Sequence, residues 1–179
     1  MEFLSAELGN SLLQDNSDKN RRNWAEKIVN EKIPILNLVD LLDAEKLIAT
    51  RFSWMVGDVC ELEPKVVFPA IHRFWSKRHE VDITNFNRSL AKMFCLCGIP
   101  KEIEGEAVSE MFEWLTDPDA IVSTKNYSLL ALGNLSGKYP ELGQELRAVI
   151  EDQLPKNSVA FEKCARKVLK QLSGSRGNS

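Results

Sequence analysis

The chain is poor in the features that identify most functional classes. It has only two histidines and four cysteines among 179 residues, and its formal net charge is −3. This small charge gives no overall attraction to nucleic acid or to an anionic membrane, although a local patch could still provide one. No uncharged apolar run approaches the roughly 18 residues that a membrane-spanning helix requires. The first ten residues, MEFLSAELGN, include early acids and do not resemble a signal peptide. We therefore expect a cytoplasmic protein without membrane association.

The cysteines and histidines are placed where they cannot form a metal site. Cys95 and Cys97 would point about 200° apart on a helix, which also prevents an unstrained disulfide between them. His72 and His79 would be on the order of 10 Å apart on one helix, too far to share a zinc ion. All four cysteines, which are Cys60, Cys95, Cys97 and Cys164, lie in apolar helical contexts. We predict that they are packing residues in a reducing compartment, and that the protein has no metal and no cofactor.

Sequence motifs of catalysis are also missing. The chain has no glycine-rich phosphate loop, no HExxH, no nucleophile elbow and no GxGxxG. A Ser-His-Asp triad needs only three residues, but a helical repeat buries a catalytic group poorly. The sequence therefore favours a non-catalytic protein over an enzyme.

Apolar residues recur at helical spacing along most of the chain, and no segment alternates as a strand does. The pattern predicts nine or ten helices joined by short connections of roughly two to six residues. The main predicted helices span about 3–14, 19–32, 44–62, 64–79, 101–115 and 140–154, with three more that end near 97, 135 and 172. Their expected N-caps are Ser17 or Asp18, Asp43, Asp82 or Thr84, Asp117 and Asn157 or Ser158. Pro69 should kink its helix or shift the start.

Two similar stretches suggest an internal repeat. Residues 126–140 read NYSLLALGNLSGKYP, and residues 50–64 read TRFSWMVGDVCELEP. Their alignment places Gly133 on Gly57, and the offset between them equals two periods of about 38 residues each. A glycine inside a helix costs about 1 kcal/mol relative to alanine, so we expect a neighbouring helix to approach closely at both positions.

Pro64, Pro100 and Pro140 open the second helices of three successive helix pairs, and their spacings correspond to a similar period. On these residues the chain resembles HEAT-like proteins of the armadillo/HEAT superfamily. The resemblance implies an all-α fold, a short right-handed α-α superhelix of about four to five helix pairs; a compact irregular helical bundle is the alternative. Three repeat units are expected at 44–79, 83–116 and 118–154, with imperfect terminal repeats at 19–42 and 157–172. The expected domains are an N-terminal cap helix at 1–18, a single repeat domain at 19–173 and a disordered tail at 174–179.

Charge is distributed unevenly over the predicted second helices. Residues 65–80 and 156–176 are mainly basic, whereas 101–117 and 141–153 are mainly acidic. Because second helices line the concave face of HEAT-like stacks, the resemblance implies a charged groove; solvated faces of amphipathic helices are the alternative. The candidate groove residues are Glu106, Glu110, Glu113, Glu145, Trp75, Trp114, His72 and Arg73. A separate basic patch is expected at Lys163, Arg166, Lys167 and Lys170, which share one helix face.

These features support two function hypotheses. The first is a non-catalytic protein–protein interaction or scaffold module that recognises a protein or peptide partner in its groove. The alternative is a DNA-acting enzyme similar to the HEAT-like alkylpurine glycosylases, but the acidic middle of the groove does not favour nucleic acid, and no catalytic residue can be assigned. A lyase or hydrolase in the groove is a third and weaker hypothesis, with no residues to support it. A homodimer is left open, because the N-terminal helix could cap the stack or exchange with a second copy.

Overall fold

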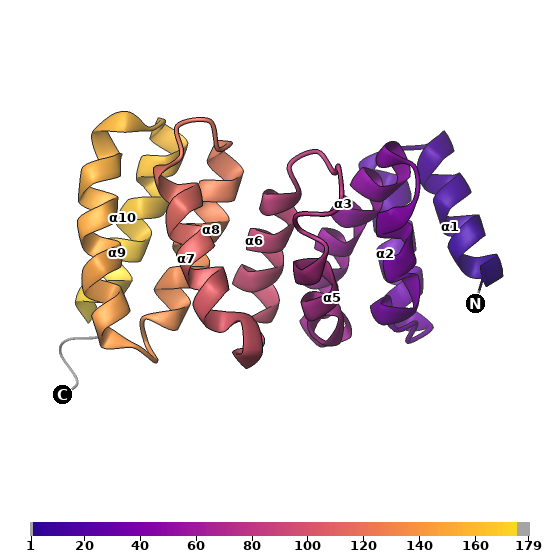
Figure 1. Ribbon diagram of the computed structural model, residues 1–179, viewed down its shortest axis with the longest axis horizontal. Coiled ribbons are helices and arrows are strands. Elements are labelled where there is room, and N and C mark those ends of the chain that lie inside the picture. Colours follow the sequence, from indigo (N-terminus) through magenta and orange to yellow (C-terminus); the bar gives the residue numbers. More distant parts are fainter. Residues whose placement is uncertain (1, 175–179) are drawn as a thin grey trace. The chain divides into compact units, whose positions relative to one another are not determined.

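The computed structural model describes residues 2–174, and all regular structure in that range is helical (Figure 1). The predicted all-α fold is therefore confirmed. The contacts divide the chain between Pro100 and Lys101 into two compact units, where the sequence predicted one repeat domain. Gly174 closes the last helix, and the rest of the predicted tail lies outside the described residues. Within that described range, no helix is both long enough and apolar enough to cross a membrane.

The first unit is organised around helix α3. Its elements are α1 (Glu2–Gln14), α2 (Asp18–Asn30), the 3₁₀ helix η1 (Ile35–Asp43), α3 (Lys46–Leu62), α4 (Pro64–Val67), the 3₁₀ helix η2 (Phe68–Ala70), α5 (Ile71–Ser76) and α6 (Phe86–Cys97). Helix α3 packs against α1, α2, η1, α4 and α6. Phe52 stacks on Phe74 at 6.0 Å, and Phe74 stacks on Phe86 at 6.4 Å between ring centroids. This aromatic row joins α3, α5 and α6 in one core.

The second unit has two pairs of helices. Its elements are the 3₁₀ helix η3 (Lys101–Ile103), α7 (Glu104–Thr116), α8 (Val122–Leu135), α9 (Pro140–Gln153), the 3₁₀ helix η4 (Leu154–Lys156) and α10 (Val159–Gly174). Helices α7 and α9 contact each other, and α8 packs closely against α10 (Figure 1). Met111, Leu132, Leu146, Ile150 and Phe161 are fully buried and form the core of this unit.

The two glycines of the predicted repeat, Gly57 and Gly133, lie where helices approach each other closely. A Cβ on Gly57 would be 3.2 Å from Cδ of Lys92 on α6, and one on Gly133 would be 3.1 Å from Cγ1 of Val168 on α10. The sequence separation between the glycine and the residue that it faces is the same in both cases. The expected close approach is confirmed, because any larger residue would push the neighbouring side chain away.

Several predicted helix starts are also confirmed. Ser17 caps α2, accepting a hydrogen bond from the backbone N–H of Asn20 at 3.1 Å. Ser158 accepts one from Phe161 at the start of α10. Pro69 interrupts its helix, which is divided into α4, η2 and α5. Proline achieves this because it lacks the N–H that a helix interior needs.

Three predicted aspartate caps are wrong, because each carboxylate has another partner. Asp43 accepts from Lys77 Nζ at 2.7 Å, and Asp82 accepts from Lys46 Nζ at 2.7 Å. Asp117 accepts from the backbone N–H of Asp119 at 2.9 Å, which forms a local turn. The following helices therefore begin later, at Lys46, Phe86 and Val122. Thr84, the other candidate cap for α6, also precedes the actual N-cap, Asn85.

Candidate binding site

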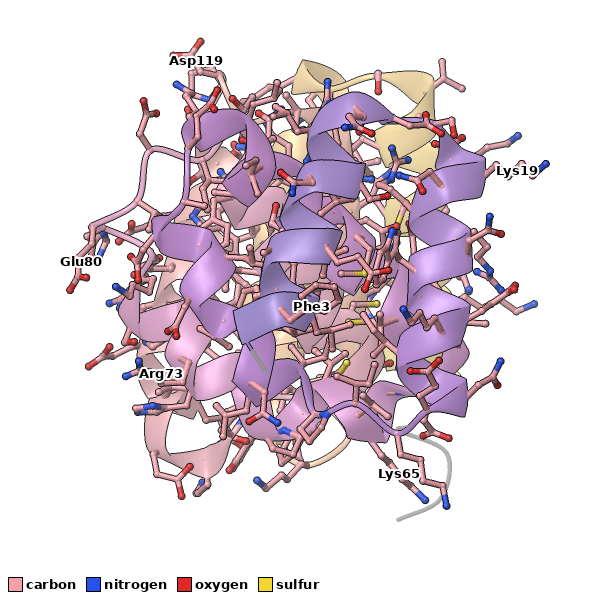
Figure 2. The ribbon with its side chains drawn as sticks, turned by 90° about the vertical axis from the view of Figure 1, so that its right-hand side faces the viewer. Phe3, Lys19, Lys65, Arg73, Glu80 and Asp119 are labelled. Atoms are coloured by element: carbon pink, nitrogen blue, oxygen red, sulfur yellow. The ribbon has the colours of Figure 1, made fainter. Side chains whose placement is uncertain are left out.

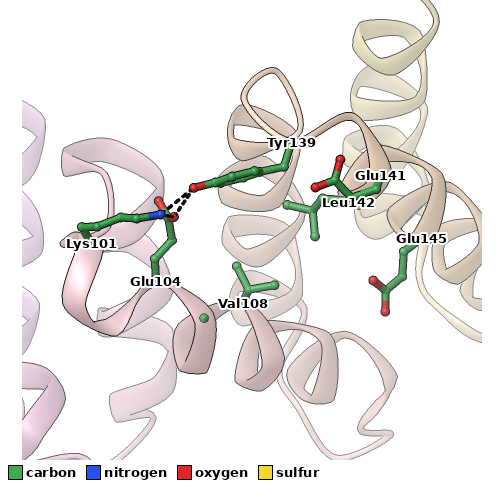
Figure 3. A pocket seen from close by; sticks show the side chains of 8 residues that line it. Lys101, Glu104, Val108, Tyr139, Glu141, Leu142 and Glu145 are labelled. Atoms are coloured by element: carbon green, nitrogen blue, oxygen red, sulfur yellow. Dashed lines mark hydrogen bonds and ion pairs between the residues drawn. The ribbon is translucent and has the colours of Figure 1, made fainter.

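A pocket of about 370 Å³ opens between the first turns of α7 and α9 in the second unit (Figure 3). It is lined by Lys101, Glu104, Gly105, Val108, Tyr139, Glu141, Leu142 and Glu145. Val108 and Leu142 supply the apolar part of the lining. A Cβ added at Gly105 would meet no atom within 4 Å, so this glycine leaves open space beside them. The pocket thus offers apolar surface surrounded by charged side chains.

One wall is a hydrogen-bonded cluster centred on the Glu104 carboxylate. The Tyr139 hydroxyl donates to Glu104 Oε1 at 2.6 Å, and Lys101 Nζ donates to both the Tyr139 oxygen (2.8 Å) and Glu104 Oε1 (2.9 Å). Lys138 Nζ donates to Glu104 Oε2 at 3.2 Å. Figure 3 shows Lys101 of η3 and Glu104, the first residue of α7, meeting the hydroxyl of Tyr139, the residue before α9. The cluster therefore ties the start of α7 to the start of α9.

These contacts hold all three charged groups in their ionised forms. The hydrogen bond from Tyr139, followed by that from Lys101, lowers the pKa of Glu104 to about 2, and this outweighs its burial. Hydrogen bonds to Tyr139 and then to Glu104 raise the pKa of Lys101, and the same two partners raise the pKa of Lys138. A carboxylate held this firmly is a poor proton donor or acceptor near neutral pH. The cluster is therefore a structural wall of the pocket and does not supply a general acid or base.

The opposite wall carries Glu141 and Glu145, four residues apart on α9. Both side chains are exposed, and neither has an ion-pair or hydrogen-bond partner within residues 2–174. Residues four apart on a helix share one face, so both carboxylates border the pocket. Counting one lysine and three glutamates, the lining has a net charge of −2. The pocket is suited to a cationic group with an apolar stem.

The predicted groove is brought together only in part. Glu145 lines the pocket, whereas Glu106, Glu110 and Glu113 lie elsewhere on α7. Trp114 is also on α7 and is half-buried. The three remaining candidates, His72, Arg73 and Trp75, belong to α5 of the other unit; His72 and Arg73 are exposed, and Figure 2 shows the outward position of Arg73.

Trp75 is a candidate groove residue, but the structure places it in the core of the first unit. Only 3% of its surface is exposed. Its ring packs on Phe94 at 5.6 Å, and the Arg78 guanidinium lies 3.8 Å from its centroid. The helical spacing of apolar residues around Trp75 agrees with this core position, because Ile71 and Phe74 are buried beside it in the sequence.

The predicted basic patch does form an exposed row on α10, made of Lys163, Arg166, Lys167 and Lys170. Arg166 is paired with Glu162 at 2.6 Å on the same helix. This ion pair reduces the excess of positive charge on the row. The row belongs to the second unit, but none of its residues lines the pocket.

Cysteines and histidines are placed partly as expected. All four cysteines were predicted to be packing residues; Cys60 is buried, whereas the other three are only half-buried. His79 lies in the turn after α5 and is exposed, like His72. Among the described residues, no three His, Cys, Asp or Glu side chains gather in an arrangement that could hold a metal ion.

Seven lining residues were not singled out from the sequence as site residues: Lys101, Glu104, Gly105, Val108, Tyr139, Glu141 and Leu142. The repeat carried a usable signal, because Tyr139 follows Lys101, and Leu142 follows Glu104, by one repeat period. Residues at equal positions in successive repeats lie beside each other when the units stack.

Comparison of the chain with models of protein families, with curated proteins and with solved structures finds no match.

Proposed function

We propose that this chain is a non-catalytic interaction module that binds a short basic segment of a partner protein in the pocket between α7 and α9. The observation that carries this proposal is the pair of carboxylates Glu141 and Glu145, which have no partner within residues 2–174 and lie beside the apolar surface of Val108 and Leu142. Desolvated apolar area provides binding energy, and the carboxylates select a cation.

A lysine or arginine side chain has the shape and charge that the pocket requires. Its methylene stem would cover Val108 and Leu142, while its charged head would reach Glu141 and Glu145. Arginine is the better fit, since its planar group can contact a carboxylate through two N–H donors. Exposed ion pairs contribute only roughly 0.2–1 kcal/mol each, so we expect weak, salt-sensitive binding.

The repeat fold is part of the same proposal. Helices α3 and α6, and likewise α8 and α10, make their glycine contacts at the same sequence separation, which supports successive helix pairs stacked with a HEAT-like period. Small-angle X-ray scattering tests this superhelix against a compact bundle. A compact chain of this length has a radius of gyration of about 16 Å. A clearly larger value supports the superhelix, and agreement with the compact value supports the bundle.

Peptide binding tests the function directly. The probes are short fluorescein-labelled peptides with one arginine between leucines, and a matched set in which glutamine replaces the arginine. Fluorescence anisotropy should detect binding of the arginine set alone. The double variant Glu141→Gln/Glu145→Gln should weaken binding about tenfold, which corresponds to about 1.4 kcal/mol.

Two further variants control for indirect effects. Glu151→Gln removes an exposed carboxylate from α9 outside the pocket and should leave binding unchanged. Gly105→Leu should fill the open space and abolish binding while the helical circular dichroism is retained. Equal binding of both peptide sets, or no effect of the double variant, would contradict the proposal.

A DNA-acting protein is the alternative, and the exposed row on α10 is the feature that favours it. Phosphate binding requires clustered lysines and arginines, which this row supplies in part. A mobility-shift assay with duplex DNA at low salt decides between the two. Tight binding that is lost on changing Lys163, Lys167 and Lys170 to glutamine would replace the peptide proposal with the DNA alternative.

A further inference from the structure

Helices α3 and α6 run parallel and in register through the first unit. Ser89 donates to the Ser53 hydroxyl at 3.2 Å, Gly57 faces Lys92, and Lys92 Nζ pairs with Glu61 at 2.7 Å. From Ser53–Ser89 to Gly57–Lys92 the contacts advance along both helices in the same direction, and Lys92 then reaches Glu61, one turn further along α3. The next residues along this interface are Cys60 on α3 and Cys97 at the end of α6.

Their side chains interact with each other across this interface. The hydrogen bond to Cys97, followed by burial, raises the pKa of the Cys60 thiol. The same hydrogen bond lowers the pKa of the Cys97 thiol. The two sulfurs also differ in access, because Cys60 is 1% exposed whereas Cys97 is half-buried.

We propose that Cys60 and Cys97 are a peroxide-sensitive thiol pair that oxidises to a disulfide between α3 and α6. Cys97 is the attacking thiol, since it is the more accessible of the two. Cys60 is the resolving thiol, held against it by the helix interface. The pairing that the sequence excluded, Cys95 with Cys97, is not involved, because those residues lie about 200° apart around α6.

The reaction balances with hydrogen peroxide as the oxidant. The Cys97 thiol releases its proton, the thiolate attacks one peroxide oxygen and the O–O bond breaks; the leaving hydroxide takes up the released proton to give water, and Cys97 becomes a sulfenic acid. The Cys60 sulfur then attacks the Cys97 sulfur, the S–OH bond breaks, and the hydroxide leaves with the Cys60 proton as a second water. Two thiols are oxidised to one disulfide while one peroxide is reduced.

Closure of the two sulfurs to the roughly 2.05 Å of a disulfide bond requires the end of α6 to adjust. Cys97 is the last residue of α6, and Gly98 after it adopts φ of +89°, so the chain leaves helical geometry at once. The bond would close a covalent loop from Cys60 to Cys97. Such a loop restricts the unfolded chain, so oxidation should raise the thermal midpoint of unfolding by about 5 °C or more.

Peptide mapping of the full chain tests the proposal. After treatment with dilute hydrogen peroxide, non-reducing mass spectrometry should find a cross-linked peptide pair containing Cys60 and Cys97, with a mass loss of about 2 Da. Cys95→Ser and Cys164→Ser should behave as the parent protein does. In Cys60→Ser the reaction should stop at the sulfenic acid of Cys97, which dimedone captures.

Because Cys60 is buried, its substitution could disturb folding. Cys60→Ala is therefore made in parallel with Cys60→Ser, and circular dichroism checks that the helices are retained. Cys97→Ser provides a second, more exposed removal of the pair and should abolish both the mass loss and the rise in the thermal midpoint. Three outcomes would overturn the proposal. They are a disulfide that involves Cys95 or Cys164, a disulfide formed only between molecules, and direct conversion of Cys97 to sulfinic acid in the parent protein.

Discussion

Three glycines inside helices differ in their surroundings, and these surroundings set the change in folding free energy that an added methyl group would cause. Gly133 faces the branched Val168, which has few alternative positions, whereas Gly57 faces the flexible stem of Lys92. Gly105 faces open space. Substitution by alanine at the three sites therefore separates the gain in helix propensity from the free-energy cost of overpacking.

Alanine substitutions at these glycines should have graded effects on stability. Gly105→Ala should stabilise the protein by about 0.5 kcal/mol, because it gains helix propensity without a clash. Gly57→Ala should be close to neutral, and Gly133→Ala should destabilise by about 1 kcal/mol as overpacking exceeds the propensity gain. Urea unfolding measures all three. Equal effects at Gly57 and Gly133 would contradict this account of the contacts.

Glu104 should give the protein a pH-dependent stability. Its folded pKa of about 2 is below its ordinary value of 4.5, so its contribution is fully present above pH 4.5 and is lost as pH falls towards 2. Glu104→Gln should cost about 1 to 2 kcal/mol at pH 7, a value moderated because its lysine partners are largely exposed to water.

The difference in free energy of unfolding between the parent and Glu104→Gln should shrink between pH 4.5 and 2, as measured by urea titrations across that range. Glu102→Gln is the matched control, since Glu102 is exposed and does not belong to the cluster. A difference that stays constant down to pH 2 would show that the carboxylate charge does not stabilise the fold.

At the scale of the elements, helix starts differ in whether a side chain caps them. Ser17 accepts from the N–H of Asn20, whereas Glu45, the N-cap of α3, makes no side-chain capping bond. Ser17→Ala should therefore destabilise the protein by about 1 kcal/mol, and Glu45→Ala should change stability by much less. Thermal unfolding of the two variants checks the contrast; an equal loss in both would mean that the Ser17 bond contributes nothing.

One face of helix α1 is exposed to solvent. Phe3 is 83% exposed on this helix and points outward in Figure 2. The opposite side is covered, since Leu8 and Leu12 are fully buried. Helix α1 is therefore packed into the first unit by its own apolar stripe, and its role as a cap stays a prediction.

At the scale of the whole molecule, the two units have separate cores. Phe74 is fully buried in the first and Phe161 in the second. We expect Phe74→Leu to reduce amide hydrogen-exchange protection mainly within residues 2–100, and Phe161→Leu to reduce it mainly within 101–174. Each change should cost about 1 to 2 kcal/mol. Equal loss of protection in both units from either variant would show that the chain unfolds as one body.

The sequence by itself determined the helices, since apolar spacing, prolines and Ser17 act through local backbone geometry. It also predicted the close contacts at Gly57 and Gly133, because an interior glycine needs a packing reason. Aspartate caps could not be predicted: Asp43 and Asp82 find lysines on distant parts of the chain, and local propensity carries no information about such partners.

Only the tertiary structure decided which side chains meet. It brought Tyr139 to Glu104 and left Glu141 and Glu145 without partners among the described residues, which produced the pocket. It also placed Cys97 against Cys60, a residue on another helix, instead of its near neighbour Cys95. The physical reason is that helical periodicity fixes the face of the helix on which a residue lies. Its partners depend instead on the register between helices that pack together in space but are far apart in the sequence.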